Sequence, residues 1–388
     1  MATTSIKKMT FIAFSLLSFT AAVCAGESDN KMKKLQKQMK QTRAENGAGT
    51  AGARMAPAKA QIENSYNFNV NFDVLYWSPD IENNSITQSS SFAPGPYGPG
   101  TAGGNGLPTA GEMIDLRYDW SWGFRVGVGY DTAHDNWDVG VDYTYFTSSA
   151  SNNLTAGNNA YYKLVRGSQA IEAAAGDGDF ATQVNSTGSL DFQNVNLTLG
   201  RAYFVSSNLE FKPTVGLRSA WINDKETVEY GGGAVVGPHG GRGFHGNNTK
   251  VIDNCKSWGI GPQIAINTTW HLDHGFSFFG NLSASAIYSS FKTTHKNCYS
   301  SDVDFNISVT NNFHAFIPNV DFFLGLRWDS LFNKNKNYFG IGLGWETQVF
   351  WNQIQRFESV EGVSATAGAW DGRDLSLQGL TIDVKIDF

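Results

Sequence analysis

The last ten residues, 379–388, alternate between apolar and polar side chains and end on an aromatic residue. One face of such a strand holds Asp383 and Lys385, and the other holds Leu380, Ile382, Val384, Ile386 and Phe388. A strand with one apolar and one charged face needs a nonpolar environment on one side and water on the other. A soluble β-sandwich meets that need, but ending on the apolar face with Phe is typical of outer-membrane β-barrels. We predict that this strand closes a barrel and that the barrel assembly machinery recognises its apolar face.

Residues 1–25 are predicted to be a cleaved signal peptide, which would export the chain to the bacterial outer membrane. Lys7 and Lys8 precede an apolar run, and a small-residue cleavage site ends at Ala25. The alternatives are a lipoprotein anchor on Cys24, which the bulky preceding Val disfavours, and an uncleaved anchor, for which the run is short. No later segment resembles a membrane helix. Barrel strands alternate apolar with polar residues, so a search for long apolar segments does not detect them.

Three further regions follow the signal peptide. Residues 26–46 are predicted to form a short basic helix in the periplasm, and 47–61 a flexible linker. From 26 to 61 there are eight Lys and Arg against three Asp and Glu (+5), and from 62 to 388 there are 19 against 32 (−13). The helix either contacts anionic lipid, cell wall or the barrel mouth, or is a solvated spacer. Residues 62–388 are predicted to form the barrel.

A period of two runs through this last region and predicts an all-β, antiparallel, up-and-down transmembrane barrel. About ten strands are expected, and a hairpin near residues 160–165 would make twelve. Aromatic residues at both ends of apolar runs, such as Trp258 and Trp270, suggest two interfacial girdles. Four short turns alternate with long loops predicted at 78–112, 148–189, 223–256, 292–311 and 352–374.

Charged residues on the alternate faces of the strands are predicted to line the lumen. They are Arg117, Asp119, Arg125, Asp138, Asp142, Glu210, Lys212, Arg218, Asp321, Arg327, Glu346, Asp383 and Lys385. Rings of charge in a hydrated channel sort ions, and the acidic balance favours cations. The alternative is that paired Arg and Asp fill a barrel of only ten strands and leave no continuous path.

The exported chain would keep two cysteines, Cys255 and Cys298, in the third and fourth predicted long loops. An oxidising compartment favours a disulfide between them. Bridges to neighbouring proteins and free thiols are the alternatives.

Five stretches of the predicted barrel stand out, at 71–77, 122–130, 209–221, 258–263 and 276–286. In this order along the chain, they resemble the major outer membrane protein family of Legionella and of the environmental Chlamydiae. The resemblance covers about 67–388 and implies an abundant, pore-forming protein of the envelope, in some members cross-linked by disulfides. Two cysteines in the exported chain do not suit extensive cross-linking.

No grouping of Ser, His and acid, or of paired carboxylates, indicates an enzyme. His271 and His274 lack the further donors that a metal site needs, and no cofactor is expected. The acidic barrel also lacks the basic patches of a nucleic-acid binder.

The sequence therefore predicts a porin for ions and small hydrophilic solutes, lying in outer-membrane lipid, with a homo-oligomer as an option. A non-conducting structural or adhesive barrel that acts through its long loops is the alternative.

Overall fold

The computed structural model describes the predicted barrel region with gaps. The described residues are 67–92, 108–132, 137–156, 160–166, 178–206, 208–231, 234–236, 248–300, 305–332, 337–359 and 368–387. The predicted signal peptide, basic helix and linker lie outside them, as does Phe388. The described residues include a 3-10 turn, η2 (Asp273–Gly275), but no helix that is both long and apolar enough to cross a membrane.

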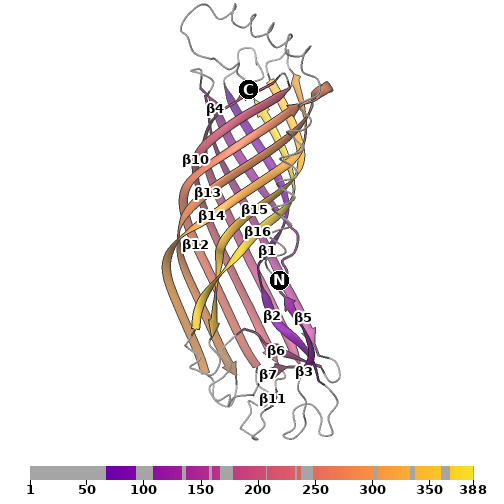
Figure 1. Ribbon diagram of the computed structural model, residues 1–388, viewed down its shortest axis with the longest axis vertical. Coiled ribbons are helices and arrows are strands. Elements are labelled where there is room, and N and C mark those ends of the chain that lie inside the picture. The colour runs from indigo at the N-terminus through magenta and orange to yellow at the C-terminus, as the bar shows by residue number, and fades with distance from the viewer. Residues whose placement is uncertain are drawn as a thin grey trace, which may run out of the picture.

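Ten antiparallel strands close into a tall barrel, with each strand paired to the next and the last paired to the first (Figure 1). In order around the barrel they are β1 (Phe68–Ile81), β4 (Ser121–Asp131), β5 (Trp137–Thr155), β8 (Gln183–Arg201), β10 (Leu209–Gly231), β12 (Asn248–His271), β13 (Phe276–Ser300), β14 (Phe305–Phe332), β15 (Asn337–Ser359) and β16 (Gly368–Asp387). A two-residue strand, β9 (Tyr203–Phe204), adds to β10. The ten-stranded up-and-down barrel is therefore confirmed.

A second, five-stranded sheet lies at the end of the barrel that carries the long connections, where it overlaps the ends of the barrel strands (Figure 1). Its strands, in order across the sheet, are β11 (Ala234–Val236), β7 (Gly178–Ala181), β6 (Ala160–Leu164), β2 (Ser85–Phe92) and β3 (Pro108–Asp115). The segment that would have raised the barrel to twelve strands is β6, which joins this second sheet. Closure of the barrel therefore needs no additional hairpin.

Short connections gather at one end of the barrel and long ones at the other. We call these the short-turn end and the long-loop end. The first and last strands meet at the short-turn end, where Asn69 pairs with Asp387. The four short connections, which follow β4, β8, β12 and β14, are also at this end, and the second sheet is at the opposite one.

The strands extend much farther toward the long-loop end than the sequence pattern predicted. Strand β10 continues from Trp221 to Gly231, and β12 begins at Asn248, well before Trp258. Much of the predicted loops 223–256 and 292–311 is therefore strand. Those loop boundaries were wrong because the apolar residues that marked each strand stop facing outward at this level.

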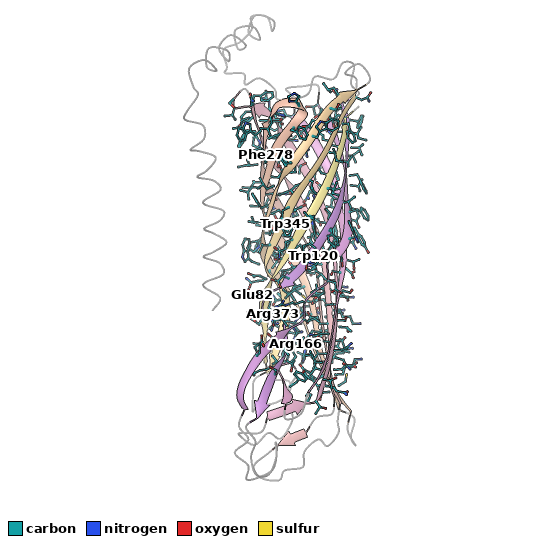
Figure 2. The ribbon with its side chains drawn as sticks, turned by 90° about the vertical axis from the view of Figure 1, so that its right-hand side faces the viewer. Glu82, Trp120, Arg166, Phe278, Trp345 and Arg373 are labelled. Atoms are coloured by element: carbon teal, nitrogen blue, oxygen red, sulfur yellow. The ribbon has the colours of Figure 1, made fainter. Side chains whose placement is uncertain are left out.

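An aromatic girdle surrounds the barrel where this change occurs. Trp221 pairs directly with Trp258, and Tyr288 pairs with Phe316; all four side chains are exposed on the outer wall. Trp120 and Trp345 lie about halfway along the molecule in Figure 2, with ring centroids 6.1 Å apart. We call the part between the short-turn end and this girdle the apolar-walled half, and the part beyond it the polar-walled half.

The two halves have opposite patterns. In the apolar-walled half, exposed outward residues such as Val128, Leu199 and Ile264 surround a polar interior. In the polar-walled half, side chains such as Phe192 and Phe291 turn inward and are buried, while polar side chains cover the outside. Apolar and polar residues still alternate along each strand, but the apolar side chains now face inward instead of outward. This arrangement suits a barrel that is surrounded by lipid over one half and by water over the other.

Candidate functional site

The interior of the barrel is where the predicted charged residues meet. Eleven of the thirteen predicted lumen residues have side chains that share the inward face with buried neighbours or ion-pair partners. They are Arg125, Asp138, Asp142, Glu210, Lys212, Arg218, Asp321, Arg327, Glu346, Asp383 and Lys385.

Arg117 and Asp119 do not line the lumen. Both are exposed, whereas the intervening Tyr118 is buried and donates its hydroxyl to Asp224 Oδ1 at 2.6 Å. Residues 116–120 are not part of a strand, so the alternation of β4 does not extend through them. The prediction was wrong at these two positions because it continued one strand's period across an irregular segment.

Arginines organise the interior of the apolar-walled half. Arg125 on β4 reaches Asp73 Oδ2 at 2.9 Å and Glu346 Oε1 at 2.6 Å, which joins β4 to β1 and β15. The carboxylates are almost completely buried. These charges are satisfied by one another, as buried charges must be.

A second arginine makes a similar bridge on the other side of the lumen. Arg218 on β10 pairs with Asp321 on β14 and contacts Asn319 Oδ1, while its Nε donates to Asn196 Oδ1 at 2.9 Å. Because β10 and β14 are not neighbours in the barrel, these bonds cross the lumen. Together with Arg125, this side chain fills interior space that a channel would leave to water.

The inward side chains are more exposed to solvent toward the short-turn end. Lys212 pairs with Asp138 at 2.8 Å, and the lysine side chain is 31% exposed. Arg327 pairs with Asp383 at 2.6 Å and is 21% exposed. His271 and Glu210 pair at 3.2 Å, and Lys385 and Asp387 at 3.4 Å. The basic members of these pairs are partly exposed to solvent. We call this part of the interior the vestibule.

Beyond the girdle, five charged side chains form a buried cluster that we call the inner ion cluster: Arg166, Asp224, Glu226, Asp253 and Arg356. Arg356 Nη2 reaches Asp224 Oδ2 at 2.5 Å and Glu226 Oε1 at 2.9 Å. Arg166 pairs with Glu226 and lies 3.7 Å from Asp253 Oδ2. All five are almost completely excluded from solvent.

Two further side chains complete the inner ion cluster. Asn84 Nδ2 donates to Glu226 Oε1 at 2.7 Å, and His295 Nδ1 lies 2.6 Å from Asp253 Oδ1. Burial raises the pKa of Asp224. Burial also disfavours the charged form of Glu226, but Arg166 and Arg356 outweigh that effect and lower its pKa. The cluster joins β10, β12 and β15 to the segment that ends in Arg166, so it holds the interior together.

Aromatic side chains close the lumen beside the inner ion cluster. We call Trp77, Phe146, Phe192 and Phe350 the aromatic layer; each has no accessible surface. The ring centroids of Phe192 and Phe350 are 5.7 Å apart. Their strands, β8 and β15, are five positions apart around a ring of ten, so this contact spans the full diameter. The lumen is filled at this level.

Other side chains anchor the aromatic layer to the polar interior. Trp77 and Phe146 have ring centroids 5.6 Å apart, and Trp77 Nε1 donates to Thr381 Oγ1 at 3.0 Å. Thr381 donates in turn to Glu346 Oε2 at 3.0 Å. The layer therefore rests directly on the Arg125 ion pairs.

The two cysteines occupy strands rather than loops, and both thiols are free. Cys255 on β12 pairs with Thr293 on β13, five residue positions from Cys298 along that strand. Cys255 is buried on the inward face, whereas Cys298 alternates with the buried Asn297 and faces outward. Disulfides need Cα atoms within about 7 Å of each other and Cβ atoms that approach. The predicted bridge between these cysteines is therefore corrected.

The two thiols should differ sharply in reactivity. Burial raises the pKa of Cys255 to about 12, so almost none of it is thiolate at neutral pH. We expect a maleimide to label Cys298 in the folded protein and Cys255 only after unfolding. Mass mapping of labelled peptides checks this. Equal labelling of the two residues in the folded state would contradict their placement.

The residues of the inner ion cluster and the aromatic layer were missing from the predicted lumen set. Asp224, Glu226, Asp253 and Arg356 lie in stretches that the sequence assigned to loops. The signal that could have found them is the inverted alternation of 222–230, where apolar Ile222, Val228 and Tyr230 share a face with two acids. All of these side chains are buried.

Two residues of the predicted assembly signal, Leu380 and Ile382, are exposed on the outer wall. The His, Cys, Asp and Glu side chains among the described residues form no group of three or more suited to a metal.

Comparison with known proteins identifies the family. The family model described as the Legionella pneumophila major outer membrane protein precursor matches residues 62–388. No curated protein sequence matches the chain. One similar solved structure is the outer membrane protease OmpT from Escherichia coli, with 10% identity and a TM-score of 0.35 over 84% of this chain and 98% of that chain. Another is a Pseudomonas aeruginosa FadL homologue, with 8% identity and a TM-score of 0.24 over 83% of this chain and 90% of that chain. At these TM-scores neither similarity bears on activity. On the family match, this chain belongs to the Legionella major outer membrane protein family of the bacterial outer membrane.

Proposed function

We propose that this protein is a non-conducting structural barrel that presents its long-loop end at the bacterial surface. The observation that carries the proposal is the contact between Phe192 and Phe350 across the whole diameter of the lumen. Short turns of outer-membrane barrels face the periplasm and long loops face outward. The polar-walled half and the second sheet would then stand above the membrane.

Energetics favour a permanently filled interior. Truncating one buried aromatic side chain costs a folded protein about 3–5 kcal/mol. Breaking a buried ion pair costs a similar amount because the remaining charge is left without a partner. A water-filled path would have to displace the aromatic layer and separate Arg356 from Asp224. Neither change is compensated by new contacts in the barrel.

The second candidate is the porin that the family resemblance implies, a passive pore for ions and small hydrophilic solutes. The partly exposed Lys212, Arg327 and Lys385 favour it, because they make the short-turn end of the lumen accessible to water. Conduction would require the aromatic layer to move aside. Paired charges of both signs near the vestibule would then give weak selectivity.

We further propose that the protein lies in outer-membrane lipid, is assembled by the barrel machinery, and has no catalytic role or nucleic-acid partner. Contacts between copies in the membrane are compatible with its apolar wall.

Solute flux separates the two functions. Folded protein, verified by a migration in unheated gels that differs from that of the boiled protein, is reconstituted into liposomes, and swelling in arabinose is recorded. The structural proposal predicts no swelling beyond that of protein-free liposomes. Swelling that scales with the amount of folded protein would favour the porin.

A further inference from the structure

We propose that the outer wall carries a binding site for the phosphate groups of outer-leaflet lipopolysaccharide. The site consists of Lys225 on β10, Lys256 on β12 and Lys292 on β13, which we call the lysine patch. The inference rests on the apolar-walled half lying in the membrane, but not on whether the lumen conducts.

The lysine patch lies where the headgroups of the outer leaflet would be. Lys256 lies on β12 two residues before the girdle residue Trp258, on the side toward the long-loop end. Lys292 lies four residues beyond Tyr288 along β13, and Lys225 four beyond Trp221 along β10. At about 3.3 Å per residue, the patch is roughly 7–13 Å along the strands from the girdle. Interfacial aromatics sit at the headgroup level, so the next outward-facing residues meet the phosphates.

The pairing of the strands brings the lysines together. Lys256 is directly opposite Lys292 in the ladder, and Lys225 is the diagonal neighbour of Lys256 because it pairs with Asn254. Directly opposite residues have Cβ atoms about 4.5–5.5 Å apart, and like charges at that spacing repel. All three side chains are exposed. An anion between them would convert this repulsion into attraction.

The described carboxylates near the patch form no ion pairs with its lysines. None of the ion pairs between described residues includes Lys225, Lys256 or Lys292. The nearby Asp191 instead accepts hydrogen bonds from Thr147 and Asn223. By contrast, Lys250, farther out on β12, pairs with Glu229 at 2.7 Å. The three lysines are therefore available to an external anion.

Positive and negative charges lie on opposite sides of the outer wall. Across the barrel from the patch, Asp80, Asp115 and Asp119 are exposed, with Arg117 between them. The patch is therefore a local concentration of positive charge on an acidic protein of formal net charge −6. A flat, exposed group of ammonium ions without a pocket fits headgroups arrayed in a lipid surface better than it fits a small soluble anion.

A neighbouring ring extends the patch toward β14. His314 is exposed two residues beyond Phe316, and its ring stacks on Tyr288 with centroids 5.6 Å apart. This pair offers a ring surface between the girdle and Lys292, because His314 is opposite Ser290 and Lys292 is opposite Asn312. A sugar ring of the headgroup would rest on it while the phosphate meets the lysines.

The test is lipid binding by the full-length folded barrel in detergent, with the lysines changed to glutamine together (K225Q, K256Q and K292Q). Each lysine near an anionic lipid surface contributes about a factor of five, so we expect about a 100-fold weaker affinity for bisphosphorylated lipid A. Dephosphorylated lipid A should bind the unchanged protein as weakly as it binds the triple variant. K250Q is the matched control, since its lysine already has a carboxylate partner, and should bind as the unchanged protein does.

Each result decides the proposal. Equal binding of phosphorylated and dephosphorylated lipid A, or equal loss of binding in K250Q, would overturn it. Competition by inorganic phosphate at concentrations comparable to those of the lipid would show a site for a small anion instead and would also overturn it. Migration in unheated gels verifies that each variant is folded, and solute flux reports on the barrel's function independently.

Discussion

Replacing Arg356 with methionine is expected to destabilise the folded barrel by about 3–5 kcal/mol. Among the described residues, the change leaves Asp224 with the Tyr118 hydroxyl as its remaining side-chain partner in a site without solvent, while Glu226 keeps Arg166. A buried carboxylate that loses its cation carries an uncompensated charge. Reversible urea unfolding in detergent or lipid, followed by tryptophan fluorescence, measures the loss.

Two variants make this prediction specific. Arg117→Met removes an exposed arginine and should change stability by less than about 0.5 kcal/mol. Adding Asp224→Asn to Arg356→Met should recover part of the loss, because the orphaned charge is removed. If Arg356→Met and Arg117→Met were equally mild, the inner ion cluster would not be the buried network described.

Replacing Phe192 with alanine is expected to cost about 3–5 kcal/mol. Its side chain has no accessible surface and packs against Phe350 across the lumen, so its loss creates a cavity that rigid strands cannot collapse to fill. The same unfolding measurement applies.

An outward phenylalanine provides the matched control. Phe322 on β14 is 39% exposed on the apolar wall, where lipid can fill the space left by truncation. Phe322→Ala should therefore cost clearly less than Phe192→Ala. An equal or reversed order would mean that the interior is not packed at the level of Phe192.

The outward apolar pattern was sufficient to predict the barrel. Runs such as Trp122 to Tyr130 carry an apolar residue at every second position, and lipid is the environment that selects them. The inward charges on the same strands followed from the same alternation, and the structure places the ion pairs of Arg125, Arg218 and Arg327 on the inward face.

The packed interior could not be predicted in the same way. Beyond the girdle, the apolar residues of a strand turn inward, so a search for lipid-facing runs ended there and assigned β10 past Trp221 to a loop. Inward glycines do not by themselves specify whether the lumen is open. Gly127 and Gly129 leave space on β4, but the side chains of Asn71 and Asn69 on β1 occupy it. Which side chains meet across a barrel depends on strand order and stagger, which alternation alone does not specify.

The most direct test of the closed lumen is single-channel recording in a planar bilayer with folded protein comprising residues 26–388. A closed lumen predicts no stepwise conductance in concentrated potassium chloride at either polarity, from protein that migrates as folded in unheated gels. Reproducible unitary steps from the same material would contradict it, because ions would then pass the level where Phe192 meets Phe350.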